Sequence, residues 1–184
     1  MKQTKLTAKR ISTLAVFTAM SLIMFLVESP FPPLFLPGAK MGLSNIFSLL
    51  ALVVLGPVDA LVVVLVRTTL GSMFSGNMST LMYSMSAGVV SILVAIVLVY
   101  TLYPNISVIA VSVVSAVVHN LVQNVVFCAV SATPEMYSYM PYLAVLGVVA
   151  GFVVGIAVML IVKGVPLKTF VSITDDGGKK EGEQ

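Results

Sequence analysis

A few polar residues interrupt the long apolar runs of this sequence, and their types suit the binding of a small polar or anionic solute. Lys40 and Asn45 flank the start of one apolar run, and Arg67 lies inside the next. A Lys or Arg at the centre of a membrane helix costs roughly 2.5 to 3.5 kcal/mol, so such a residue calls for a partner or a water-filled cavity. These cations therefore mark a candidate site.

A second polar group is concentrated in one later apolar run. His119 and Gln123 are four residues apart, as are Asn120 and Asn124, and Asn120 and Gln123 are three apart. On a helix these spacings place the side chains on one stripe about 100° wide, which should face protein or water rather than lipid. Together with the linker residue Asn77, the two groups give the predicted solute site: Lys40, Asn45, Arg67, Asn77, His119, Asn120, Gln123 and Asn124.

Each of these residues also has a structural explanation. Lys40 could extend to the lipid headgroups, and Arg67 could do the same or pair with Glu28. The amides could bridge neighbouring helices, and a single histidine such as His119 is more often a structural hydrogen-bond partner than a ligand. The solute-site hypothesis depends on the expected coincidence of these residues on one side of a membrane.

The composition indicates an integral membrane protein. Of the 184 residues, 59% are hydrophobic and only 9% are charged, whereas a soluble domain has about 25% charged residues. A helix needs about 20 apolar residues to cross the bilayer, so we predict one all-α domain over residues 1–170 with six spans. The expected spans are about 7–27, 43–55, 57–74, 81–102, 106–130 and 141–162, and a disordered tail is expected over 171–184.

The basic residues indicate the orientation of these spans. They precede the first apolar run and follow the last one, so the positive-inside rule places both termini in the cytoplasm. The loops 29–42, 71–80 and 131–140 then lie outside, next to the predicted site. This placement accounts for the net charge of +3 without a nucleic-acid partner. The basic residues in question are Lys2, Lys5, Lys9, Arg10, Lys163 and Lys168.

The sequence contains none of the common catalytic or metal-binding motifs. It has no Walker A sequence, no GxSxG and no HExxH. Its single cysteine, Cys128, excludes an intrachain disulfide and a thiolate metal cluster, and the pair Asp175 and Asp176 lies in the expected tail. We therefore predict no catalytic residue, no metal and no cofactor, and an ATP-driven importer built on this chain would need ATPases from other chains.

Several segments resemble a bacterial membrane family. These are PGAKMGLSN at 37–45, LGP at 55–57, RTTLGSMFSG at 67–76 and HNLVQN at 119–124. They are similar to the family called heptaprenyl diphosphate synthase component I, or the Gx transporter family, and the resemblance covers about 7–165. That family in turn resembles the six-helix S components of energy-coupling factor (ECF) transporters. The resemblance implies a location in the bacterial cytoplasmic membrane.

The resemblance also implies partners. In S components an AxxxA pattern on the first helix contacts a transmembrane T component, which works with two ATPases. Ala15 and Ala19 match this pattern, and residues 30–42 occupy the position of the substrate gate. The family name instead implies isoprenoid metabolism, although the chain lacks the Asp-rich DDxxD motif of prenyl diphosphate synthases.

Two main functions follow as hypotheses. In the first, the chain captures a small polar or anionic solute for import, energised by a T component and two ATPases. In the second, it is a non-catalytic membrane accessory in prenyl diphosphate or quinone metabolism, with a polyprenyl synthase or a redox protein as its partner. A third hypothesis is a permease that acts alone, with His119 or Glu28 as its proton site.

Overall fold

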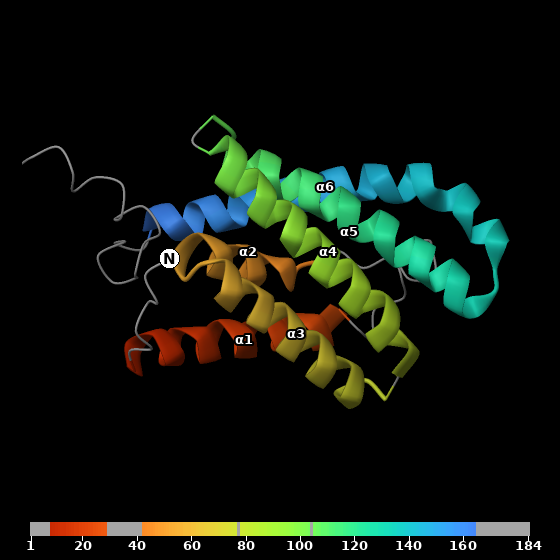
Figure 1. Ribbon diagram of the computed structural model, residues 1–184, viewed down its shortest axis with the longest axis horizontal. Coiled ribbons are helices and arrows are strands. Elements are labelled where there is room, and N and C mark those ends of the chain that lie inside the picture. Colours follow the sequence, from red (N-terminus) through yellow and green to blue (C-terminus); the bar gives the residue numbers. More distant parts are fainter. Residues whose placement is uncertain (1–7, 29–41, 77, 104, 165–184) are drawn as a thin grey trace, which may run out of the picture.

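The computed structural model describes residues 8–28, 42–76, 78–103 and 105–164, and in these ranges it contains six α-helices, one 3-10 helix and no strand (Figure 1). The all-α prediction is confirmed for this part of the chain. The elements are α1 (Ala8–Glu28), α2 (Asn45–Val54), α3 (Pro57–Phe74), α4 (Met78–Leu102), α5 (Val108–Ser131), η1 (Pro134–Tyr139) and α6 (Met140–Gly164).

Five of the described α-helices are long and apolar enough to cross a membrane, so the chain is a multi-pass membrane protein. The exception is α2, which has 10 residues and is about 15 Å long, half the thickness of the hydrocarbon core. Glycines with positive φ stand on both sides of it, Gly42 at 72° and Gly56 at 116°. Five of the six predicted spans thus form helices that are long enough to cross a membrane, whereas the segment expected at 43–55 forms a shorter helix.

The long helices pack side by side in the order α1, α3, α4, α5, α6, and the short α2 contacts α1, α3, α4 and α6. The described part of α1 begins and α6 ends at the same end of the bundle, on the left in Figure 1. We call this the Arg10 end. The opposite end, where α1 and α3 finish, is called the Glu28 end.

The boundaries of the helices follow from local capping signals. Ser107 accepts a hydrogen bond from the Ala110 N–H at 3.1 Å at the start of α5, and Ala132 ends this helix in the left-handed conformation. Pro57 occupies the first turn of α3, where its missing N–H is no loss. The predicted bounds agree with the observed ones within three residues at every helix end. The expected tail at 171–184 lies outside the described residues.

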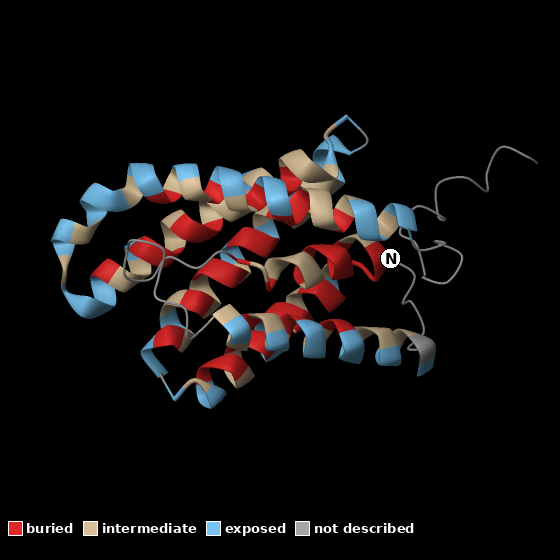
Figure 2. Cartoon of the chain, turned by 180° about the vertical axis from the view of Figure 1, so that it is seen from behind, coloured by how far each residue is buried: buried red, intermediate tan, exposed pale blue. Residues whose placement is uncertain are grey.

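The short helix α2 forms the centre of the hydrophobic core. Its residues 49–52 are at most 4% exposed, and they pack with Val63 and Val64 of α3. Figure 2 shows that buried residues occupy the faces that the helices turn toward one another, with exposed residues on the outer faces. Exposed side chains such as Val149 and Phe152 are suited to contact with lipid. The middle of α2 is therefore surrounded by apolar side chains.

Helices α5 and α6 approach closely because α6 has a glycine at every fourth position, Gly147, Gly151 and Gly155. A Cβ atom at Gly151 would lie 2.6 Å from the Cα atom of Val113, and one at Gly155 would lie 2.7 Å from the Cα atom of Ile109. Small residues four apart allow such backbone approach between membrane helices. This repeat was overlooked in the sequence, and it fixes the face that α5 turns toward α6.

Candidate functional site

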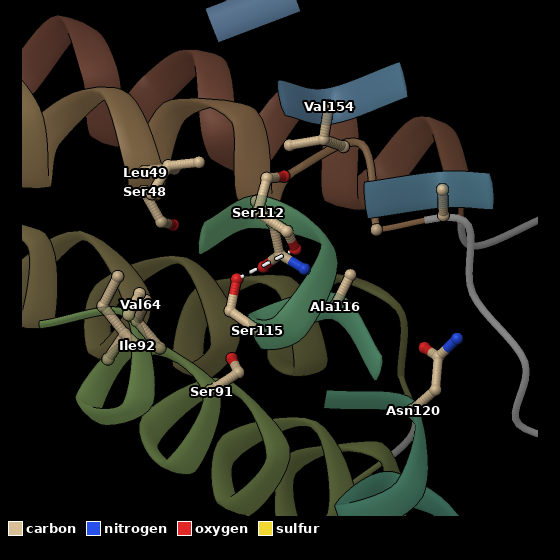
Figure 3. A pocket seen from close by; sticks show the side chains of 14 residues that line it. Ser48, Leu49, Val64, Ser91, Ile92, Ser112, Ser115, Ala116, Asn120 and Val154 are labelled. Atoms are coloured by element: carbon tan, nitrogen blue, oxygen red, sulfur yellow. Dashed lines mark hydrogen bonds between the residues drawn. The ribbon is translucent and has the colours of Figure 1, made fainter. Parts of the chain in front are cut away.

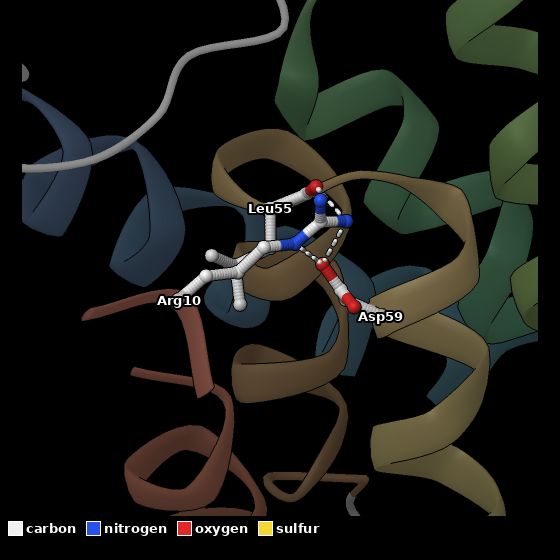
Figure 4. Close-up of polar contacts among 3 residues, drawn as sticks. All are labelled: Arg10, Leu55 and Asp59. Atoms are coloured by element: carbon white, nitrogen blue, oxygen red, sulfur yellow. Dashed lines mark hydrogen bonds and ion pairs between the residues drawn. The ribbon is translucent and has the colours of Figure 1, made fainter. Parts of the chain in front are cut away.

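Among the described residues, two clusters of polar side chains lie between the helices, one toward each end of the bundle. At the Arg10 end, Arg10 of α1 forms an ion pair with Asp59 of α3 (Figure 4). The Nε and Nη2 atoms lie 2.7 Å and 2.6 Å from Asp59 Oδ2, and Nη2 also lies 3.4 Å from the Leu55 carbonyl oxygen. We call this the Arg10–Asp59 pair. It joins α1 to α3 and to the end of α2, which gives it a structural role.

Arg67 of α3 is the central residue of the other cluster. It is 1% exposed, and its Nη2 atom donates a hydrogen bond of 2.6 Å to the Asn45 side-chain oxygen at the start of α2. Its Nε and Nη1 atoms have no acceptor among the described residues. A buried donor without an acceptor costs about 1 to 3 kcal/mol, and more when it is charged. The guanidinium is thus positioned by Asn45 and retains unused donors.

Glu28, at the end of α1, provides a negative charge in the same cluster. Its carboxylate accepts a hydrogen bond from the backbone N–H of Leu43, just before α2, and it attracts the Arg67 guanidinium electrostatically. Glu28 and Arg67 line a small cavity of about 10 Å³ together with Ser84 of α4 and His119 of α5. Four helices therefore contribute a polar residue to one buried position.

The polar stripe of α5 is divided between two neighbouring helices. Asn120 donates to the Leu143 carbonyl oxygen of α6, and Asn124 donates to the Met136 carbonyl oxygen of η1, both at 3.1 Å. His119 instead lies on the α4 side, where its Nδ1 atom is 3.3 Å from Ser91 Oγ. Asn120 and Asn124 therefore each donate to a carbonyl oxygen of a neighbouring element, and Asn120 also lines a cavity beside α2; their role in solute binding stays a prediction. Their amides bridge helices, as the structural explanation proposed.

Gln123 shares the His119 side of α5, because residues four apart lie on the same helix face. It is 2% exposed, and neither its amide nitrogen nor its amide oxygen has a partner among the described residues. Buried polar side chains almost always have a hydrogen-bond partner. An amide with both of its polar atoms unused is therefore a candidate ligand group, as the sequence predicted for this residue.

A second cavity, of about 30 Å³, lies beside the first and is lined by hydroxyl groups. Ser48, Ser91 and Ser112 reach it from α2, α4 and α5, and Figure 3 shows their side chains around one space. Asn45, Ser115 and Asn120 also line it, and the rest of its wall is apolar. Its described lining residues are Gly42, Asn45, Ser48, Leu49, Val64, Ser91, Ile92, Ala95, Ser112, Ser115, Ala116, Asn120, Ala150 and Val154.

Gly42 stands where the two cavities meet, since it lines both of them. Its φ of 72° is one that side chains other than glycine rarely adopt, and a Cβ atom here would lie 2.9 Å from the side-chain nitrogen of Asn45. A glycine is therefore needed both for the turn and for the position of Asn45. The hydrogen bond from Arg67 to Asn45 depends on this arrangement.

The structure thus brings together three of the predicted solute-site residues, since Arg67 bonds to Asn45 and lines a cavity with His119; Gln123 is buried on α5 but lines neither cavity. Lys40 and Asn77 lie outside the described residues. The serine hydroxyls and Glu28 were missing from the predicted site, although Ser84 and Ser91, seven residues apart on α4, and Ser112 and His119, seven apart on α5, follow a helical repeat. The described residues contain no group of three His, Cys, Asp or Glu side chains that could hold a metal ion.

The predicted partner-contact residues lie on the outside of the bundle. Ala15 and Ala19 are both exposed on α1, and so are Ser12 and Val16. The neighbouring Phe17, in contrast, is buried in the core. This placement leaves the small-residue face of α1 accessible to lipid or to another helix.

Comparison with known families gives one match. A sequence model of the family described as heptaprenyl diphosphate synthase component I matches residues 17–161. The matched range includes every described residue of the cluster around Arg67, but it excludes Arg10. The resemblance predicted from the sequence segments is confirmed. No curated protein and no solved structure matches the chain.

Proposed function

The chain belongs to the heptaprenyl diphosphate synthase component I family, and we propose that it captures a small polar or anionic solute at Arg67 for transport across the membrane. The observation that carries this proposal is a buried guanidinium with two nitrogens that have no acceptor among the described residues. A protein that needed Arg67 only for stability would gain by satisfying or replacing these donors. A solute with oxygen acceptors would satisfy them when it binds.

Asn45 and Gln123 would orient this solute. Asn45 holds one nitrogen of the guanidinium, which directs the remaining N–H groups away from α2. The amide of Gln123 offers both a donor and an acceptor, neither of which has a partner among the described residues. A charged donor beside a neutral amide is a combination that recognises a carboxylate or a similar oxygen-rich group.

We propose that the Glu28 end of the bundle faces the outside. Arg10 and Lys163 lie at the opposite end, at the start of α1 and in the last turn of α6. The positive-inside rule assigns this basic end to the cytoplasm. The solute would then enter from outside and reach Arg67 in the outer half of the bundle, in a bacterial cytoplasmic membrane.

Energy for import would come from other chains, namely a transmembrane T component and two ATPases. The exposed Ala15 and Ala19 of α1 support this arrangement, because small residues four apart allow another helix to pack closely. Substitution of both alanines by leucine should reduce copurification of such partners. The same substitution should leave solute binding at Arg67 unchanged, since both side chains point away from the site.

The family description favours a second candidate, a non-catalytic membrane accessory in prenyl diphosphate or quinone metabolism. In this case the partner would be a polyprenyl synthase or a redox protein. The described cavities near Arg67 are small, about 10 and 30 Å³, so either ligand would require the surrounding side chains to move. The buried guanidinium with unused donors favours the solute-capture function.

Native mass spectrometry of the full-length protein, extracted in a mild detergent, tests the proposal. We expect a small molecule bound to the wild type, absent from Arg67→Gln and retained by the double variant Arg10→Gln/Asp59→Asn, which removes the other buried arginine. A wild type without a bound molecule, or a molecule that remains on Arg67→Gln, would contradict the proposal. A copurified polyprenyl synthase without a T component and ATPases would favour the second candidate.

A further inference from the structure

The small cavity next to Arg67 has the size of a single water molecule. Its volume is about 10 Å³, and a buried water needs roughly 10 to 15 Å³ on this measure. Arg67, Ser84 and His119 line it from α3, α4 and α5, and Glu28 lines it from the end of α1. A larger molecule enters only if these side chains move, whereas a water fits without such movement.

Two of the lining residues carry buried polar atoms that have no partner among the described residues. These atoms are Nε and Nη1 of Arg67 and Oγ of Ser84. The two residues are 1% and 3% exposed, so bulk water does not reach them in this arrangement. Buried polar groups in native proteins almost always have a partner, and a buried water often provides it where the protein does not.

Arg67 and Ser84 lie across the contact between α3 and α4. A Cβ atom at Gly88 of α4 would lie 3.9 Å from Arg67 Nη2, so this part of α4 is next to the guanidinium. Ser84 is four residues before Gly88 and therefore lies on the same side of α4. One turn of an α-helix rises about 5.4 Å, which is close to the length of two hydrogen bonds in series. A single water between the two side chains matches this spacing.

We propose that one ordered water molecule occupies this cavity and bridges the Arg67 guanidinium to the Ser84 hydroxyl. The water accepts a hydrogen bond from a guanidinium N–H, and it exchanges another with Ser84 Oγ, which can donate and accept. The Glu28 carboxylate lines the same cavity and offers an acceptor for the second hydrogen of the water. A bare cation would lie next to the guanidinium charge, and a halide ion is larger than a water.

This inference goes beyond the proposed function and does not depend on it. The water links α3 to α4 whether or not a solute binds. It does not neutralise the guanidinium, which therefore keeps its attraction for an anionic group. A solute that binds at Arg67 has to displace the water and replace its hydrogen bonds, so the water contributes to the affinity and selectivity of that step.

Hydroxyl radical footprinting of the full-length protein in lipid nanodiscs tests this proposal. A short X-ray pulse converts water to hydroxyl radicals, and mass spectrometry measures how fast each side chain is oxidised. Phe25 lines the cavity, whereas Phe17, eight residues earlier on α1, packs in the apolar core and lines neither cavity.

We expect Phe25 to be oxidised about tenfold faster than Phe17, because a buried water stays at its site and forms radicals there. Solvent exposure predicts the opposite order, since Phe25 is 3% exposed and Phe17 is 8% exposed. Equal rates, or faster oxidation of Phe17, would overturn the inference.

Substitutions at Ser84 show whether the oxidation comes from this water. Ser84→Val removes the hydroxyl and adds a methyl group to the cavity, so the oxidation of Phe25 should fall to the level of Phe17. Ser84→Ala should lower it about threefold, because the water loses one of its partners. The matched control is Ser86→Ala, which removes a hydroxyl that bonds to the Met82 carbonyl oxygen and should leave the oxidation of Phe25 unchanged.

Unchanged oxidation of Phe25 in the Ser84 variants would overturn the inference. The thermal unfolding of each variant, measured in the same nanodiscs, shows whether it is folded. If Ser84→Val does not fold, the comparison of Ser84→Ala with Ser86→Ala decides the question.

Discussion

Arg10 and Arg67 of the described bundle each have a carboxylate nearby, Asp59 and Glu28, but they differ in how their donors are used. Arg10 directs its Nε and Nη2 atoms at the carboxylate of Asp59, which lies on a neighbouring helix. Arg67 has one hydrogen bond, to the neutral Asn45, and keeps two nitrogens without an acceptor among the described residues. The first arrangement is that of an internal connection between helices. The second is incomplete by itself.

This difference separates polar groups that stabilise the fold from candidate ligand groups. A buried ion pair with good geometry compensates for much of its own desolvation, whereas unused donors in an apolar interior leave that cost uncompensated. Buried groups without partners are rare in native proteins and call for an explanation. Ser84, which lines the same cavity as Arg67, is another such group.

Breaking the Arg10–Asp59 pair should give the largest loss of stability. Asp59→Ala leaves the guanidinium of Arg10 mostly buried without its carboxylate, which should lower the free energy of unfolding by about 3 kcal/mol. The loss can be measured by unfolding the purified protein with increasing amounts of SDS in mixed micelles.

The matched control is the double variant Arg10→Gln/Asp59→Asn, which removes both charges and keeps polar side chains in place. Its loss should be about 1 kcal/mol, since no unpaired charge is left. If Asp59→Ala is no less stable than this double variant, the pair does not hold the Arg10 end together.

A substitution at Gly42 should disturb the Arg67 region with an intermediate effect. Gly42→Ala introduces a Cβ atom at a φ of 72° and 2.9 Å from the Asn45 side chain. The backbone strain costs about 1 to 2 kcal/mol, and the displacement of Asn45 should weaken solute binding about tenfold through its effect on Arg67.

Gly76 provides a comparison with a similar backbone conformation. Its φ is 67°, and a Cβ atom there would meet no other atom within 4 Å. Gly76→Ala should therefore cost about 1 kcal/mol of stability without any change in solute affinity. Equal affinities of the two variants would mean that Asn45 does not position Arg67.

Replacement of Gln123 should give the smallest effect, and one of opposite sign. Gln123→Met keeps a side chain of similar shape and removes two buried polar atoms without partners, so it should raise the free energy of unfolding by about 1 kcal/mol. It should also weaken solute binding. Asn120→Leu is the contrasting variant: it deletes a hydrogen bond to the Leu143 carbonyl oxygen and should lower stability by about 0.6 to 2 kcal/mol. If both substitutions changed the free energy of unfolding in the same direction, the two sides of α5 would not differ in role.

Much of the fold could be predicted from the sequence, because hydrophobic runs and Gly or Pro residues identify membrane helices directly. The bounds of α3, Pro57–Phe74, were predicted correctly, and the Gly56 and Pro57 turn explains why. The length of α2 was the harder case. Its apolar composition is typical of a span, but Gly42 and Gly56 restrict it to 10 residues, and only the packing around it shows that it lies inside the bundle.

The site was predicted in part. Arg67, Asn45 and the α5 stripe could be identified because polar residues are rare in such a sequence. The sequence could not predict that this polar stripe is divided between two neighbouring helices. A face 100° wide on α5 meets both α4 and α6, and the sequence does not reveal which amide meets which helix. The pairing of Arg10 with Asp59, 49 residues apart, was also missed, because each had a sufficient local explanation at the membrane surface.

The most direct test of the central claim compares the two arginines by solute binding. Native mass spectrometry of the full-length protein in a mild detergent should show a small molecule bound to the wild type and lost from Arg67→Gln, because the charge-assisted contact of the guanidinium is removed. The double variant Arg10→Gln/Asp59→Asn, although less stable, should retain the molecule. Binding that survives in Arg67→Gln, or that is lost equally in both variants while they remain folded, would contradict the account.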